Sequence, residues 1–133
     1  MPTYRRDDTL RRAIGSVLGQ TYRNLELIVV NDNGDDNMFT PRVREIVSSF
    51  ALIDSRVRIL EPPVHKNGAF ARNRGVESSA GSYLAFLDDD DWWEREKIEH
   101  QVDAFSSLTD DWGVVSCRVK RFRGDVPISV LPK

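Results

Sequence analysis

The 133-residue sequence has few cysteines, no long apolar run and little excess charge of either sign. Its single cysteine, Cys117, excludes an internal disulfide and favours a reducing, cytoplasmic setting. No stretch approaches the ~20 apolar residues that span a bilayer, and the N-terminal residues lack the apolar segment of a signal peptide. A net charge of -2 gives no basic excess of the kind that binds nucleic acid. These absences leave an ordinary globular protein.

What the sequence does contain is an alternation of strand-like and helix-like patterns. Apolar residues at helical spacing predict helices over residues 10–20, 41–50, 68–80 and 95–108. Continuous or alternating apolar runs predict strands over residues 25–30, 57–60, 82–87 and 113–119. Such alternation is typical of an α/β fold with a mostly parallel sheet and helices on both faces. We expect one domain over residues 1–133.

Two acid-rich loops directly follow predicted strands. Residues 31–37 follow the first strong strand pattern, and four consecutive aspartates follow residues 82–87. In parallel sheets the carboxyl ends of the strands share one edge, where ligands collect. We therefore expect Asp32 and Asp90 to face one cleft.

The four consecutive aspartates, 88–91, need a positive partner. Two unit charges ~6 Å apart repel by roughly 3 kcal/mol at an effective dielectric of ~20. Mg²⁺ or Mn²⁺ is commonly held by one or two carboxylates while substrate phosphates and water complete the shell. A calcium loop with its glycine and terminal glutamate is not recognisable here. A solvated acidic turn is the alternative to a metal site.

Six short segments occur in one order along the chain: residues 2–4, 13–22, 24–26, 28–32, 71–75 and 86–91. Together they resemble the donor-binding half of family 2 glycosyltransferases. The resemblance implies a Rossmann-like GT-A sheet. It also implies transfer of a sugar, with inversion, from a nucleotide-diphosphate donor, expected to be a UDP-sugar. The acceptor would be a glycan or another hydroxyl, in cell-surface polysaccharide biosynthesis at the inner face of the membrane.

The same resemblance implies roles for residues outside the aspartate run. Asp32 matches the aspartate that bonds the nucleotide base, commonly uracil. Tyr4 matches a ring near that base, and Thr3 lines the same pocket. Arg72 matches a helix segment that borders the donor, so its positive charge would lie near the diphosphate.

Within the run, the resemblance implies an Asp-x-Asp motif. Asp90 would hold Mn²⁺ or Mg²⁺ on the donor diphosphate, and Asp88 would contact the ribose or the water of the metal. Asp89 would share either task, whereas Asp91 is expected to cap the following helix. The metal would act as a Lewis acid on the leaving group. No catalytic residue is identified, because in the family the base belongs to the acceptor half, beyond Lys133.

The sequence departs from the family pattern at both ends. Only Met1 precedes the Pro-Thr-Tyr stretch, so the first central strand is expected to be missing and the chain truncated. Strand exchange with a second copy would fill the gap. The main alternative is a truncated, non-catalytic fragment or interaction module. A nucleotidyltransferase ranks lower, because residues 1–7 contain no glycine for a phosphate loop.

Overall fold

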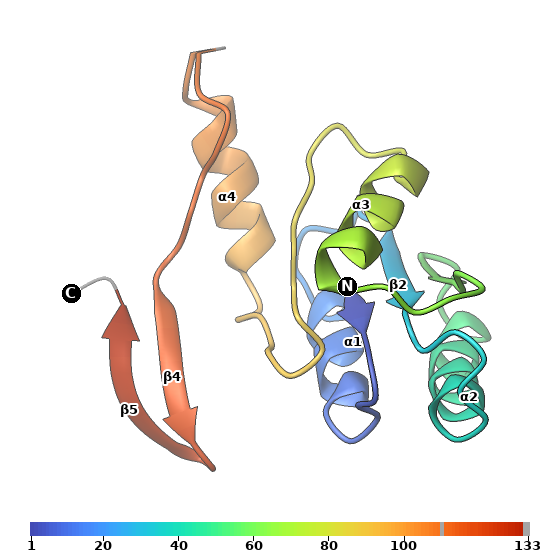
Figure 1. Ribbon diagram of the computed structural model, residues 1–133. Helices are drawn as coiled ribbons and strands as arrows, with labels where there is room; N and C mark the ends of the chain where they lie inside the picture. Colours follow the sequence, from blue (N-terminus) through green and yellow to red (C-terminus); the bar gives the residue numbers. More distant parts are fainter. Residues whose placement is uncertain (110, 132–133) are drawn as a thin grey trace. The chain divides into compact units, whose positions relative to one another are not determined.

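The computed structural model describes residues 1–109 and 111–131 (Figure 1). The chain forms two compact units, unit 1 (Met1–Glu96) and unit 2 (Lys97–Lys133). Whether they act as the one domain expected from the sequence stays a prediction. No helix among the described residues is long and apolar enough to cross a membrane.

The helices and strands alternate through unit 1 and then give way to a hairpin. Unit 1 contains β1 (Pro2–Thr3), α1 (Leu10–Leu18), β2 (Leu27–Asn31), α2 (Phe39–Ala51), β3 (Val57–Leu60) and α3 (Gly68–Ser78). Unit 2 contains α4 (Lys97–Ser106), β4 (Val119–Arg123) and β5 (Val126–Leu131). The four predicted helices are confirmed, each end within two residues of its expected position.

The sheet of unit 1 is parallel, with strand order β1-β2-β3. β2 lies between its two neighbours, with Val30 opposite Pro2 and Leu27 opposite Val57. All five β2 residues are buried, as the continuous apolar run predicts for a strand covered on both faces. This is the arrangement expected of part of a Rossmann-like GT-A sheet.

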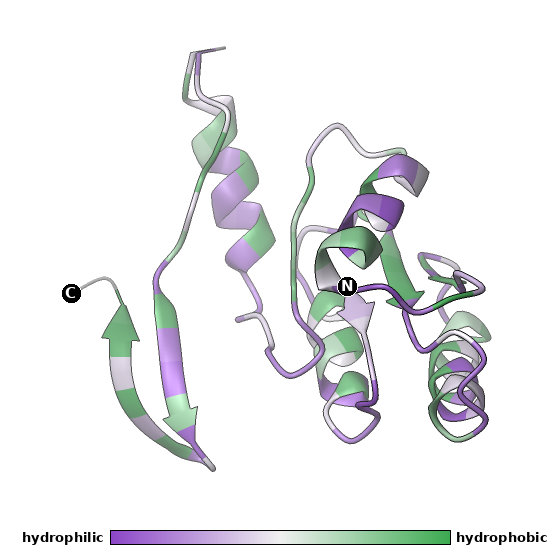
Figure 2. Ribbon diagram, in the orientation of Figure 1, coloured by the Kyte–Doolittle hydropathy of each residue, from purple (hydrophilic) through white to green (hydrophobic). Residues whose placement is uncertain are grey.

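Helices cover both faces of this sheet. Successive strand residues point to opposite faces, so Val29 joins α1 and α2 while Val30 joins α3. The larger core consists of side chains from one face of the sheet and its helices, including Leu10, Ala13, Ile14, Val17, Leu27, Val29, Val43, Ile46, Val47, Val57 and Leu87. Figure 2 shows β2 as strongly hydrophobic, in contrast to the largely hydrophilic α3.

One strand prediction in unit 1 is wrong. The expected loss of the apolar strand before Pro2 stays a prediction, and the first strand of the sheet consists of the two residues of β1. Residues 82–87, expected to be a strand, are not assigned to one, although Leu87 packs into the core. The shortness of β1 explains why residues 82–87 form no strand beside it. Its two residues offer few backbone hydrogen-bonding groups, and Pro2 has no N–H.

Unit 2 combines α4 with an antiparallel hairpin of β4 and β5. The predicted strand over residues 113–119 is wrong in its bounds, since β4 begins at Val119. β4 ends at a two-residue turn that begins with Gly124, whose φ of 57° lies in the left-handed region that such a turn requires. Arg123 pairs with Val126 across that turn, and the pairing runs back to Val119 opposite Leu131.

Candidate functional site

A cavity of about 370 Å³ opens at the carboxyl edge of the parallel sheet in unit 1. All seven residues that the sequence predicts for the site line this cavity. The full lining consists of Pro2, Thr3, Tyr4, Arg6, Asp32, His65, Gly68, Ala71, Arg72, Asp88, Asp89 and Asp90. The expectation that Asp32 and Asp90 face one cleft is therefore confirmed.

β1 and β2 deliver the first part of the lining. The backbone N–H of Asp32 donates to the carbonyl of Thr3 at 2.9 Å, which joins the ends of the two strands. Asp32 is 1% exposed, and its Oδ1 accepts from the Lys66 N–H at 3.3 Å. Tyr4 projects further and is 41% exposed. A buried carboxylate thus lies close to an accessible aromatic ring.

Buried asparagines hold the loop that follows β2. The Asn33 amide donates to Oδ1 of Asn31 at 2.6 Å, and Oδ1 of Asn33 accepts from the backbone N–H of Arg5 at 2.7 Å. Asn31 in turn donates to Oε1 of Glu61 at 3.1 Å. These side chains supply the hydrogen bonds that an irregular buried backbone needs. They link the loops that follow β1, β2 and β3 at one edge.

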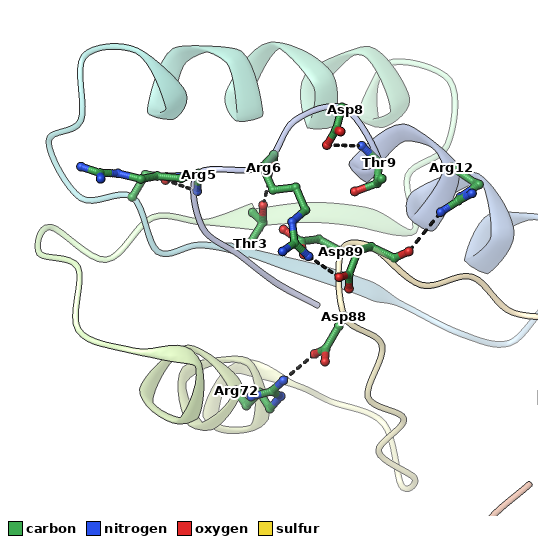
Figure 3. Close-up of polar contacts among 11 residues, drawn as sticks. Thr3, Arg5, Arg6, Asp8, Thr9, Arg12, Arg72, Asp88 and Asp89 are labelled. Carbon is green, nitrogen blue, oxygen red and sulfur yellow. Dashed lines mark hydrogen bonds and ion pairs between the residues drawn. The ribbon is translucent and has the colours of Figure 1, made fainter. Parts of the chain in front are cut away.

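The aspartate run is neutralised by arginines from elsewhere in unit 1 (Figure 3). Arg72 on α3 pairs with Oδ1 of Asp88 at 2.5 Å. Arg6 pairs with Oδ2 of Asp90 at 2.5 Å and with Oδ1 of Asp89 at 3.2 Å. Although burial opposes it, these two neighbouring carboxylates raise the pKa of Arg6. Arg6 and Arg72 therefore supply part of the positive charge that the run of aspartates needs.

The end of α1 and the residues directly after it hold the segment that follows the aspartates. The fully buried Gln20 amide donates to the carbonyl of Glu94 at 2.8 Å, and the Trp93 N–H donates to Oγ of Ser16 at 3.1 Å. The expected cap role of Asp91 is wrong, because α4 begins only at Lys97. Burial, with the like charges of its neighbours, instead raises the pKa of Asp91.

Asp89 is the most buried carboxylate of the run, at 7% exposure. Its Oδ1 accepts from Arg6, whereas Oδ2 has no hydrogen-bond partner among the described residues. Burial raises the pKa of Asp89 above its ordinary value. A buried acceptor without a donor is costly, and a ligand hydroxyl would satisfy it.

This burial predicts a pH-dependent stability cost. The raised pKa of Asp89 means that the folded chain binds the proton more tightly than the unfolded chain. Ionised Asp89 destabilises the folded chain. This destabilisation grows as the pH rises from the ordinary pKa of aspartate to the raised pKa of Asp89 in the folded chain, and it reaches its full size above that pKa. The Tm of Asp89→Asn, relative to wild type, should therefore increase across this window in thermal unfolding. A difference in Tm that is the same at every pH contradicts the assignment.

The oxygen donors at the cavity suit a small hard cation. The side chains of Asp88 and Asp90 are 49% and 48% exposed, so both can reach a metal ion or its water. Among residues 1–109 and 111–131, no group of three His, Cys, Asp or Glu side chains forms a ready metal cage. Mg²⁺ and Mn²⁺ sites with one or two carboxylates, completed by substrate phosphates, need no such cage.

Two lining residues with polar side chains, Arg6 and His65, are missing from the sequence prediction. Arg6 belongs to a group of arginines near the N-terminus, a pattern that is typical of a solvated surface, and only its proximity in sequence to Thr3 and Tyr4 indicates a place in the site. His65 has no partner spacing in the sequence. The structure stacks its ring on Tyr4, with centroids 3.9 Å apart and planes 14° apart.

Comparison with curated proteins finds bacterial glycosyltransferases. WfgD of Escherichia coli, a UDP-Glc:alpha-D-GlcNAc-diphosphoundecaprenol beta-1,3-glucosyltransferase, is 40% identical over 102 residues, covering 77% of this chain and 38% of WfgD. WfaP of Escherichia coli, described by the same activity, is 34% identical over 74% of this chain and 37% of its own. AmsB of Erwinia amylovora, an amylovoran biosynthesis glycosyltransferase, is 29% identical over 81% of this chain and 35% of its own.

The chain thus spans less than two fifths of the length of these relatives. The model of the family described as "Glycosyl transferase family 2" matches residues 1–130, nearly the whole sequence. The chain therefore belongs to glycosyl transferase family 2.

Proposed function

We propose that this chain binds the nucleotide-sugar donor in a metal-dependent glycosyltransferase. The donor is a UDP-sugar, and the sugar passes with inversion to a hydroxyl of a glycan acceptor. The observation that carries the proposal is the single cavity that gathers all seven predicted residues. The activities of WfgD and WfaP, both UDP-glucose glucosyltransferases, support the choice of donor.

The uridine end of the donor would lie at the β1 and β2 side of the cavity. The partly exposed ring of Tyr4 offers a stacking surface, and the buried carboxylate of Asp32 offers a hydrogen-bond acceptor. Thr3 is buried and also lines this side of the cavity. The unpartnered Oδ2 of Asp89 would accept a hydrogen bond from a ribose hydroxyl.

The diphosphate would lie between the two arginines of the site. Arg72 and Arg6, now paired with aspartates, carry the fixed positive charge that orients a phosphate group. Asp90 and Asp88 would hold Mn²⁺ or Mg²⁺, which when bound supplies Lewis-acid stabilisation of the leaving nucleoside diphosphate. The residues of this chain therefore position the donor and its leaving group, and none is assigned as the base.

Calorimetric titration of UDP with Mn²⁺ against wild type and Asp90→Ala tests this proposal. We expect the substitution to weaken binding about tenfold or more. It removes a carboxylate that binds the metal, and such a charged interaction contributes at least ~1.4 kcal/mol to the free energy of binding. Chelation of the metal should weaken binding to wild type by a similar factor.

Asp103→Ala is the matched control, since Asp103 is an exposed aspartate of α4 and does not line the cavity. It should bind UDP with wild-type affinity. Equal affinity of wild type and Asp90→Ala, without dependence on metal, contradicts the assignment of Asp90. No binding of UDP to any of the three proteins favours the alternative of a non-catalytic module.

A further inference from the structure

The ring of His65 occupies the stacking surface that a nucleobase would need. Its centroid lies 3.9 Å from that of Tyr4, and the two rings are nearly parallel. Its Nδ1 lies 2.9 Å from Oδ2 of Asp32 and 2.8 Å from the carbonyl oxygen of the same residue. Both partners are acceptors, so Nδ1 carries a proton and donates it.

These contacts are those that the proposed function assigns to the base of the donor. In this structure the imidazole of His65 stacks on Tyr4 and directs an N–H at Asp32. In the proposed complex uracil would make the same two contacts. The separation of 3.9 Å leaves no space for a third ring between Tyr4 and His65. One ring or the other can fill this position.

The position of His65 follows from the loop that carries it. Residues 61–67 connect β3 to α3, and the loop after β2 packs closely against them. A Cβ built on Gly34 would lie only 2.8 Å from the backbone nitrogen of His65. The Lys66 N–H donates to the other oxygen of Asp32. Asp32 therefore has neighbours from this loop at both carboxylate oxygens.

We propose that His65 is an internal occupant of the base subsite, which the nucleobase displaces when the donor binds. The inference rests on the proposed function, because that function places the base on Tyr4 and Asp32. Its consequence is a competition within the chain: the stack and the hydrogen bond of His65 are lost before those of the base are gained. The affinity for the donor is then lower than the contacts of the donor alone would give.

Removal of the histidine ring should therefore tighten nucleotide binding. We expect His65→Ala to bind UDP, in the presence of Mn²⁺, about tenfold more tightly than wild type. A stacked ring and a hydrogen bond each contribute roughly a few-fold to such an equilibrium. His100→Ala is the matched control, because His100 is exposed on α4 and does not line the cavity. It should bind UDP with wild-type affinity.

The outcomes separate the two proposals. Weaker or unchanged binding by His65→Ala, with UDP still bound by wild type, overturns the role of His65 and leaves the proposed function intact. Absence of UDP binding to wild type and both variants overturns the proposed function. Tighter binding by His65→Ala alone supports both.

Nuclear magnetic resonance of the His65 ring protons gives a readout in the free chain. The ring current of Tyr4 should shift these resonances in wild type, and Tyr4→Ala should remove the shift. Addition of UDP to wild type should move them in the same direction as Tyr4→Ala does. Resonances that are identical in wild type and Tyr4→Ala show that the stack is not formed and overturn the inference.

Discussion

Replacing Leu10 with alanine is expected to reduce the free energy of unfolding by roughly 2–5 kcal/mol. Leu10 is 0% exposed at the first turn of α1 and belongs to the larger core of unit 1. Truncation would remove apolar contacts and leave a cavity that the packed neighbours fill only in part. Urea unfolding, followed by circular dichroism, measures the loss. Against a total of about 5–15 kcal/mol for a typical domain, the effect is large.

Leu52→Ala is the matched control for this prediction. The substitution is the same, leucine to alanine, but Leu52 lies at the end of α2 and is 87% exposed. Its truncation should change the free energy of unfolding by less than about 0.5 kcal/mol. A similar loss in both variants contradicts the placement of Leu10 in the core.

Replacing Gly34 with alanine is expected to reduce the free energy of unfolding by about 2 kcal/mol or more. Its φ of 57° lies in the left-handed region, which costs an alanine roughly 1–2 kcal/mol. The added Cβ would also lie 2.8 Å from the backbone nitrogen of His65, a contact that forces one loop to shift. Overpacking of this kind adds roughly 1–3 kcal/mol. Urea unfolding measures the sum.

Gly124→Ala separates the two contributions. Gly124 has the same φ of 57°, but a Cβ there would meet nothing within 4 Å. Its replacement should therefore cost only the backbone strain. If Gly34→Ala is no more destabilising than Gly124→Ala, the close approach of the loops after β2 and β3 is absent.

The helices were predictable because local spacing determines which face is buried. Leu10, Ile14 and Val17 recur at helical spacing and are all buried on α1. Strands depend on partners that the local pattern does not reveal. Residues 82–87 have a strand-like composition, yet two-residue β1 offers them little backbone to pair with. In unit 2, β4 is defined by its pairing with β5 across the turn at Gly124, which apolar alternation alone does not indicate.

The site was predictable as far as it follows from topology and from resemblance. Parallel strands bring the loops after them to one edge, so Asp32 and Asp90 could be placed together from the order of the elements. Arg6 and His65 could not. The ion pair of Arg6 with Asp89 joins residues 83 positions apart, and the contact of His65 with Asp32 joins residues 33 apart. Such pairs follow from tertiary packing and leave no local periodic signal.

The helices on the two faces of the sheet of unit 1 bury very different numbers of residues. α1 buries four residues in the larger core, whereas α3 buries only Ala71 and rests on a small group with Ile28 and Val30. We therefore expect α3 to open at a lower free energy than the rest of unit 1. Arg72 lies on α3, so a ligand that binds both Arg72 and the aspartates would stabilise α3 in its folded, packed state. Donor binding and local folding of α3 would then be one coupled equilibrium.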